Sequence, residues 1–245
     1  MEELFEILHE NRDLLVINKP AGLVCHPTKT DARSSLIGRV RLHLGAEAHP
    51  HLVNRLDRET SGIVIVAKQD EAARELRRLW ESRDVEKNYL AIVHGWVAEQ
   101  SGVIEAPLGK DEQSQVAIKD CVRPDGAAAQ TEFWVERRFQ ARRRNFELAP
   151  FSLLRVRPRT GRKHQIRIHL AHVGHAIVGD KIYGADEDLY LALVEDRLTE
   201  EQRSQLIFPH HALHAGEVRF FWRDREMVFR ADPEPWFVEF VALSA

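Results

Sequence analysis

The segment His51–Ala67 reads HLVNRLDRETSGIVIVA, and we expect the rest of the chain to be organised around it. Residues 51–53 are typical of the end of a strand, and the β-branched run 62–67 predicts a buried strand. The polar stretch between them is therefore a loop fixed at both ends. Such a loop can present Asp57 with little loss of geometry, because reactive side chains are often carried by loops on a rigid framework. Taken alone, the segment is equally compatible with a charged surface turn.

The composition predicts a chain that folds around a substantial core. It has 245 residues, 44% of them hydrophobic, which suits one large domain or two small lobes, and we expect a single domain over residues 1–245. No apolar run in the sequence is long enough to span a membrane, and the first residues are acidic, unlike a secretory signal. We expect a soluble, cytoplasmic monomer.

The two cysteines, Cys25 and Cys121, lie far apart in the sequence and outside any Cys-x-x-Cys pattern. Neither a disulfide framework nor a cysteine zinc site is indicated. We interpret both as buried packing residues.

The distribution of charge says more than the net charge of −3. A negative total argues weakly against a nucleic-acid partner, but the basic residues gather in two clusters that together predict a polyanion site. The clusters are Arg137, Arg138, Arg142, Arg143 and Arg144, and then Arg155, Arg157, Arg159, Arg162, Lys163 and Arg167. Acidic residues collect at 186–201, and we interpret residues 186–206 as a peripheral helical insertion.

The order of predicted elements indicates an α/β chain with a mixed sheet. A helix at 71–82, capped by Asp70, separates strands at 62–67 and 87–95, and this order is consistent with a crossover connection. The other predicted strands are 4–8, 14–18, 23–26, 131–139, 146–156, 213–215, 217–222 and 227–231. The other predicted helices are 34–44, 163–173 and a short one from Pro235.

The helix predicted at 163–173 begins where cations are dense. Its apolar residues recur at helical spacing, and a glycine follows it. The free backbone N–H groups at its start would lie beside Arg162, Lys163 and Arg167, so a phosphate could bind there.

Four motifs follow one another along the chain: NKPAG (18–22), NRLDRETSG (54–62), KNY (87–89) and TGRKHQIRIHL (160–170). Together they resemble the motifs of the RluA-type pseudouridine synthases, and LHA at 213–215 resembles a further segment of that family. One such motif alone would be weak evidence, but four in order make the resemblance specific.

The resemblance implies an isomerase that converts uridines of transfer or ribosomal RNA to pseudouridine without metal or organic cofactor. It also implies an α/β (α+β) catalytic domain with a central mixed, mostly antiparallel sheet, flanking helices and an RNA-binding cleft. We expect the chain to begin directly in that domain, without the additional N-terminal RNA-binding domain of many relatives.

The resemblance also assigns catalytic roles to residues. Asp57 matches the catalytic aspartate; whether it attacks the uracil ring, bonds the sugar or removes a sugar proton stays open. Arg167 matches the arginine that pairs with this aspartate, and such a pair lowers the carboxylate pKa and keeps it ionised. Tyr89 matches the tyrosine that stacks on the flipped uracil, although a core aromatic on a strand would look the same.

Substrate contacts are expected from two segments. Arg55 matches an arginine that enters the space left by the extruded base, where stacking offsets part of the unstacking cost. Asn54 stands where the family usually has histidine and lacks an aromatic plane and a titratable proton. We expect Asn54 and Arg55 to bind substrate together with Arg162, Lys163 and His164.

Two other interpretations deserve weighing. Seven histidines between His164 and His214 could suggest a metal site, but His164 and His169 are five residues apart and do not share a helix face well. We expect no metal.

The chain could also be a catalytically inactive RNA-binding protein of the same fold, for which Asn54 is the hint. Turnover of uridine-containing RNA separates that protein from an enzyme.

Overall fold

The structure is a computed structural model that describes residues 4–27, 31–45, 47–142, 147–184 and 186–242. The chain divides into two compact units, which we call unit 1 (Met1–Asn88 with His214–Glu234) and unit 2 (Tyr89–Leu213 with Pro235–Ala245). The boundary between the units falls inside two strands, β5 (Val85–His94) and β11 (Leu213–Trp222). The prediction of a single catalytic domain over the whole chain stays a prediction.

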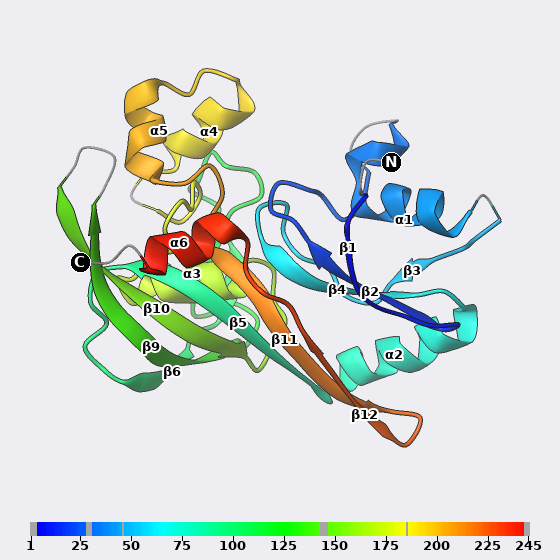
Figure 1. Ribbon diagram of the computed structural model, residues 1–245. Helices are drawn as coiled ribbons and strands as arrows, with labels where there is room; N and C mark the ends of the chain where they lie inside the picture. Colours follow the sequence, from blue (N-terminus) through cyan, green and yellow to red (C-terminus); the bar gives the residue numbers. More distant parts are fainter. Residues whose placement is uncertain (1–3, 28–30, 46, 143–146, 185, 243–245) are drawn as a thin grey trace. The chain divides into compact units, whose positions relative to one another are not determined.

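Unit 1 is built on a mixed sheet in which β1, β2, β4 and β11 are neighbours in that order (Figure 1). Its strands are β1 (Glu6–Glu10), β2 (Leu14–Lys19), β3 (His51–Leu52), β4 (Ser61–Ala67), β12 (Arg225–Arg230) and residues of β11. β4 and β11 pair in parallel, and the other pairings of this unit that the structure describes are antiparallel. The predicted mixed, mostly antiparallel sheet is confirmed.

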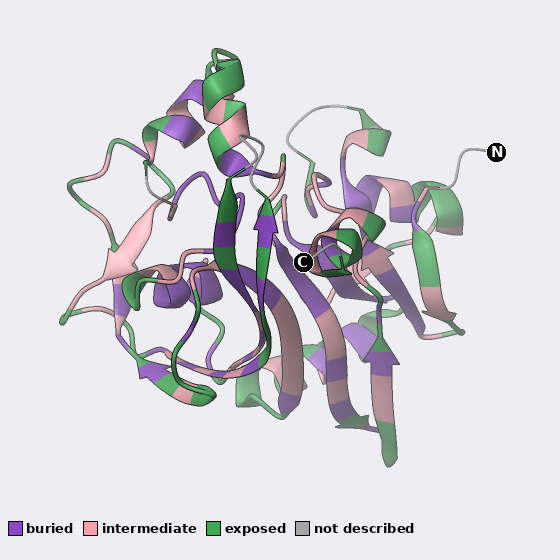
Figure 2. Cartoon of the chain, turned by 60° about the vertical axis from the view of Figure 1, so that its left-hand side comes forward, coloured by how far each residue is buried: buried purple, intermediate pink, exposed green. Residues whose placement is uncertain are grey.

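β4 is buried along its whole length because it has covering elements on both faces (Figure 2). Ile63 and Ile65 pack in one cluster with residues of helix α2 (Asp70–Ser82). Val64 and Val66 alternate with them and pack in a second cluster with residues of helix α1 (Leu36–Leu44). Because successive side chains of a strand point to opposite faces, β4 contributes to two separate hydrophobic cores. The predicted buried strand is confirmed.

Unit 2 contains an antiparallel sheet with β5, β10, β9 and β6 in order, and a small separate pair, β7 with β8. Its further strands are β6 (Ser101–Glu105), β7 (Leu108–Lys110), β8 (Asp120–Val122), β9 (Gln130–Arg142) and β10 (Leu148–Pro158). Its helices are α3 (Gln165–His172), α4 (Asp188–Val194), α5 (Glu200–Leu206) and α6 (Pro235–Ala242). Helices α4 and α5 lie together within the predicted insertion 186–206 (Figure 1).

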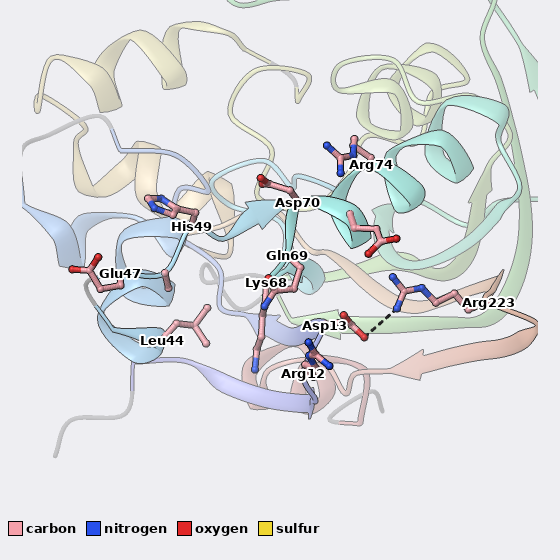
Figure 3. A pocket seen from close by; sticks show the side chains of 12 residues that line it. Arg12, Asp13, Leu44, Glu47, His49, Lys68, Gln69, Asp70, Arg74 and Arg223 are labelled. Carbon is pink, nitrogen blue, oxygen red and sulfur yellow. Dashed lines mark hydrogen bonds and ion pairs between the residues drawn. The ribbon is translucent and has the colours of Figure 1, made fainter.

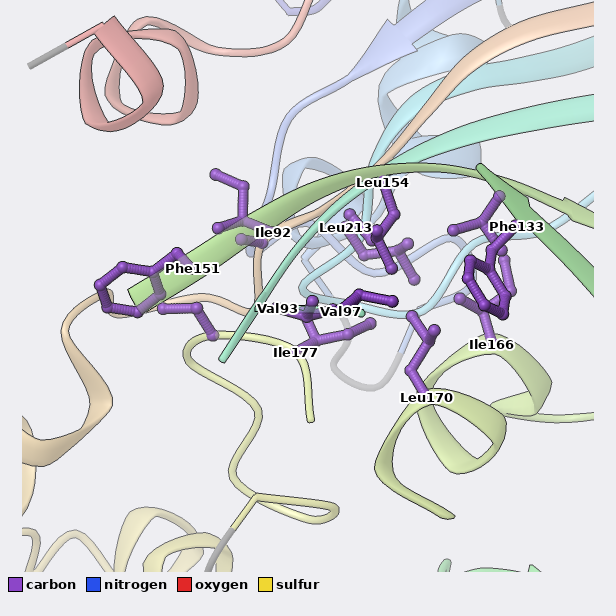
Figure 4. Close-up of a cluster of buried hydrophobic side chains, with 14 of the residues drawn as sticks. Ile92, Val93, Val97, Phe133, Phe151, Leu154, Ile166, Leu170, Ile177 and Leu213 are labelled. Atoms are coloured by element: carbon purple, nitrogen blue, oxygen red, sulfur yellow. The ribbon is translucent and has the colours of Figure 1, made fainter. Parts of the chain in front are cut away.

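The main core of unit 2 lies between α3 and the strands. Ile166 and Leu170 of α3 belong to the same buried cluster as Phe133 and Leu154 of the sheet (Figure 4). Phe240 of α6 packs edge-on against rings of β9 and β10. These contacts fix α3, which carries Arg167 and directly follows Arg162, Lys163 and His164, against a buried framework.

Several predicted boundaries need correction. Helix α3 begins at Gln165 and not at 163, because His164 has a φ of 54° and cannot continue a right-handed helix. The strand predicted at 23–26 is wrong: Val24 makes only an isolated bridge to Ser35. The predicted helical insertion consists of two short helices, α4 and α5, and Arg143 and Arg144 of the first basic cluster lie outside the described residues.

Both cysteines are free, but only Cys25 is buried; Cys121 is half-exposed, so the packing prediction is wrong for it. Among the helices of the described residues, none is long and apolar enough to cross a membrane.

Candidate active site

The loop that carries Asp57 is held to β4 by Asn54. The Asn54 side chain donates from Nδ2 to the Ile63 carbonyl at 3.0 Å and accepts at Oδ1 from the Ile65 N–H at 2.8 Å. The amide therefore pairs with β4 much as another strand residue would. The prediction that Asn54 also binds substrate stays a prediction.

Lys19 holds the same loop from the other side. Its ammonium group is fully buried and donates to three carbonyl oxygens, those of Pro20, Leu23 and Arg58, at 2.9, 2.9 and 3.2 Å. Burial lowers the pKa of Lys19 to about 8, although the Asp57 carboxylate acts in the opposite direction. Lys19 belongs to the motif NKPAG, but the sequence alone did not predict a role for it.

Asp57 lies between these fixed points. It is half-buried, and its carbonyl accepts a hydrogen bond from the Thr60 N–H at 3.2 Å across a tight turn. Leu56 before it contacts the Cys25 sulfur through its backbone. Arg55 is exposed and, within the described part of the chain, makes no hydrogen bond or ion pair. The loop thus presents the carboxylate of Asp57 and the exposed guanidinium of Arg55 from a fixed backbone.

A buried Ser–His pair fixes the end of the loop. Ser61 Oγ lies 2.9 Å from Nδ1 of His214, and Nε2 of His214 lies 2.9 Å from the Ala231 carbonyl. Since a carbonyl only accepts, Nε2 carries the proton and Nδ1 accepts from the serine hydroxyl. Burial lowers the pKa of His214, which favours this neutral form.

The predicted site residues of unit 2 gather around α3. Arg167 is buried and forms a bidentate ion pair with Asp180, with Nε to Oδ2 at 2.6 Å and Nη2 to Oδ1 at 2.9 Å. The sequence did not predict this pairing, because Asp180 lies in a segment of no regular helical or strand period, 13 residues beyond Arg167. Tyr89 is half-buried on β5, where it is in register with Val156 and packs against the core.

The three residues before α3 have different surroundings. His164 Nδ1 lies 2.8 Å from the Tyr183 hydroxyl. Lys163 is exposed and pairs with Asp120 at 2.9 Å, and Arg162 is exposed with its Nε donating to the Ala128 carbonyl at 3.2 Å. Arg162 and Lys163 are thus exposed, and His164 contacts Tyr183. The prediction that these three residues bind substrate stays a prediction.

The structure thus places Asn54, Arg55 and Asp57 in unit 1, and Tyr89 and residues 162–167 in unit 2. The pairing of Asp57 with Arg167 stays a prediction. Buried histidines use protein groups as partners: His169, for instance, lies 2.8 Å from Thr131 Oγ1 and 2.9 Å from the Ala106 carbonyl. Among the residues that the structure describes, no three His, Cys, Asp or Glu side chains are placed to hold a metal ion.

A separate pocket of about 770 Å³ lies in unit 1, near the end of β4 that is remote from Asp57 (Figure 3). It contains none of the predicted site residues, and its charges largely compensate one another; Arg223 Nη1, for example, lies 3.2 Å from Asp13 Oδ2. We therefore do not assign the reaction to this pocket.

The sequence matches the family described as RNA pseudouridylate synthase over residues 13–172, and the chain belongs to this family. The order of the four sequence motifs had predicted this class, and the prediction is confirmed.

Similar proteins come from several bacteria. A protein named uncharacterized RNA pseudouridine synthase YlyB, from Bacillus subtilis, is 33% identical over 88% of this chain and 64% of its own length. A ribosomal large subunit pseudouridine synthase D from Xanthomonas campestris is 36% identical over 87% of this chain and 61% of its own. Curated relatives of this kind are longer: this chain spans 55% of an Aquifex aeolicus relative and 65% of one from Chlorobaculum parvum.

Solved structures show the same fold. Human RNA pseudouridylate synthase domain containing 1 aligns with a TM-score of 0.75 at 23% identity, covering 100% of this chain and 90% of its own. Human RNA pseudouridylate synthase domain containing 4 aligns with a TM-score of 0.71 at 25% identity, covering 97% and 92%. The predicted fold class is confirmed.

Proposed function

We propose that this protein is an RNA pseudouridine synthase in which Asp57 is the catalytic carboxylate. The observation that carries the proposal is the loop at 54–60, in which Asn54 and Lys19 hold the backbone on both sides of a half-buried Asp57. Family membership gives the reaction, and the loop gives a fixed carboxylate that can perform it.

The reaction is balanced without a cofactor. The bond between uracil N1 and the ribose C1′ breaks, uracil turns, and a bond forms between C5 and C1′; the proton lost from C5 is matched by one gained at N1. An ionised carboxylate assists by adding to the ring or to C1′, or by removing a sugar proton. Lys19 lies close enough to Asp57 for the two charges to attract each other.

We propose that Arg167 pairs with Asp57, as the resemblance to the family implies, and keeps its carboxylate ionised. Tyr89 would stack on the uracil. Arg55, exposed on the loop, would enter the space that the flipped base leaves, and Arg162 and Lys163 would bind backbone phosphates.

The substrate class follows from the relatives. Several are named for the large ribosomal subunit, so we propose structured RNA, with ribosomal RNA before transfer RNA. Two unpaired cysteines fit a reducing compartment, and we propose that the enzyme acts in the cytoplasm.

The test is Asp57→Asn, which removes the charge and nearly preserves the shape. We expect pseudouridine formation to fall by at least ~10²–10³-fold, since a single electrostatic contact in an active site is worth that much, while RNA affinity and the unfolding midpoint stay close to wild type. Asp224→Asn, in the turn between β11 and β12, is the matched control and should retain activity. Turnover by Asp57→Asn above a few per cent of wild type would refute the role of Asp57.

The alternative is an inactive RNA-binding protein, suggested by Asn54 in the place of the usual histidine. The two hydrogen bonds of Asn54 show that it can support the loop. A wild-type protein that binds RNA but forms no pseudouridine in any uridine-containing RNA would favour this alternative.

A further inference from the structure

Asp180 is a buried carboxylate that lies in the segment between α3 and α4 and has no role in the function proposed above. We propose that Asp180 is a positioning residue, which holds the guanidinium of Arg167 in the single orientation that serves Asp57. The inference rests on the proposed function, because it assumes that Arg167 acts at the aspartate.

The contact geometry fixes the plane of the guanidinium. Two parallel hydrogen bonds, from Nε to Oδ2 and from Nη2 to Oδ1, join the planar fork of Arg167 to the planar carboxylate of Asp180. The side chain of Asp180 is inaccessible to solvent and that of Arg167 is 5% exposed, so water does not compete for these bonds. The guanidinium cannot turn without breaking both.

The carboxylate is itself held by backbone groups. Asp180 Oδ1 also accepts the N–H groups of Ile182 and Tyr183, each at 3.0 Å. The turn is tight on both sides: a Cβ at Gly179 would lie 2.4 Å from the His210 carbonyl oxygen, and one at Gly184 would lie 2.4 Å from that of Asp180. Asp180 thus projects from a backbone that has little freedom to shift.

Tyr183 restrains the guanidinium from a second direction. The Cζ atom of Arg167 lies over the Tyr183 ring, 5.0 Å from its centre. The Tyr183 hydroxyl accepts the Asp120 N–H at 3.2 Å and contacts His164 Nδ1 at 2.8 Å. Ring and carboxylate together fix both the position and the tilt of Arg167.

The ion pair between Arg167 and Asp180 also determines the electrostatic contribution of Arg167. Burial raises the pKa of Asp180, but Arg167 outweighs that effect and holds the pKa well below its usual range. Asp180 therefore stays ionised and balances the charge of Arg167. Arg167 then contributes directed N–H donors and little net attraction for RNA phosphates, and donors oriented in advance need no rearrangement during the reaction.

Asp180→Asn separates positioning from folding. The asparagine Oδ1 can still accept the two backbone N–H groups and Nη2, but its Nδ2 then faces the Nε–H donor of Arg167 and the fork is lost. We expect kcat to fall ~10- to 100-fold, as for a small misplacement of a reacting group, with KM and RNA affinity within about twofold of wild type. Glu187→Gln removes one of the two ion-pair partners that the structure gives Lys119 in the same unit, and it should leave kcat unchanged.

A double variant tests whether Asp180 acts through Arg167. In an Arg167→Met background, Asp180→Asn should lower kcat no further. If the two losses multiply, or if Asp180→Asn alone retains wild-type kcat, or if KM rises in step with the fall in kcat, the positioning role is overturned.

A measurement that needs no activity keeps this inference separate from the proposed function. In the wild-type protein the Nε–H proton of Arg167, assigned by its loss in Arg167→Met, should exchange with solvent much more slowly than that of the exposed Arg55. Exchange at the rate of Arg55 overturns the inference even if the enzyme is active or Asp180→Asn fails to fold. A slow Arg167 proton in a protein with no turnover would support the geometry and refute the enzyme.

Discussion

At the scale of single residues, the Asp57 loop is supported by polar side chains that take backbone groups as partners. Asn54 bonds two groups of β4, and Lys19 bonds three carbonyls, including that of Arg58 next to the aspartate. Buried backbone groups that lose a partner are costly, so these side chains are difficult to replace.

Asn54→Ala is expected to lower the free energy of unfolding by ~1–3 kcal/mol, because the Ile63 carbonyl and the Ile65 N–H lose their partner. Pseudouridine formation should fall as well, since the loop is then attached at fewer points. Urea denaturation measures the first effect. Gln69→Ala, which removes an exposed side chain that caps no N–H of α2, is the control and should change stability little. Equal stability of Asn54→Ala and wild type would contradict the anchoring role.

Lys19 gives stability a distinct pH dependence. Its pKa is lowered to about 8 in the folded protein from 10.5, so between these pH values the unfolded chain binds a proton that the folded protein has lost. The unfolding free energy therefore gains a contribution that rises with pH in this window, by at most about 1.4 kcal/mol per pH unit. Lys19→Met should be less stable throughout and should lack this rise. If the unfolding free energies of the wild-type protein and Lys19→Met change with pH in parallel, Lys19 keeps its usual pKa in the folded protein.

At the scale of elements, β4 and β11 approach closely where the loop meets the sheet. Ser61 is in register with His214 and Gly62 with Ala215, in the parallel pairing of unit 1. The Ser61–His214 hydrogen bond joins the two strands through side chains, and glycine at position 62 lets their backbones meet. This contact fixes the point from which the Asp57 loop leaves the sheet.

Gly62→Ala tests this approach. The residue has a φ of +111°, and a Cβ would lie 2.4 Å from the Ala215 carbonyl oxygen. We expect a loss of ~1–3 kcal/mol from the backbone conformation alone and a further loss from separation of the strands. Gly45→Ala is the control, with φ of +99° but no atom within 4 Å of its added Cβ. Comparable thermal midpoints for the two variants would mean that the strands can separate without cost.

At the scale of the whole molecule, the basic residues serve two purposes. Arg138 holds the 97–100 segment by donating to the carbonyls of Val97 and Ala98 at 2.7 and 3.0 Å, and Arg137 donates to the Val241 carbonyl. These arginines are thus part of the fold of unit 2. Arg142 and Arg162 are exposed and remain candidates for phosphate contacts.

RNA binding should weaken steeply with salt despite the net charge of −3. For single-stranded contacts, log affinity falls with log salt by about 0.7 per neutralised phosphate. Replacing Arg142, Arg143 and Arg144 together by glutamate should flatten this slope and leave the pattern of modified uridines unchanged, since backbone contacts carry no sequence information. Filter binding at several salt concentrations measures the slope. Unchanged binding by the triple variant would place the RNA elsewhere.

The sequence by itself determined the local features of this protein. The run at 62–67 predicted a buried strand, because β-branched residues with apolar neighbours on both faces suit no other common element. The order of motifs predicted the family and, through it, the fold class. Each of these signals is contained in a few consecutive residues. Each reflects the conformation that the local backbone prefers.

The tertiary structure decided which polar groups inside the protein pair with one another. Ser61 and His214 are 153 positions apart, and Lys19 and Arg58 are 39 apart, so no periodicity could have joined them. Arg167 and Asp180 are closer in sequence, but a turn with two obligatory glycines brings them together. His164 has a left-handed backbone conformation, and α3 begins only after it. Burial then fixes these pairs, because a polar group removed from water must find its partner wherever the fold places one.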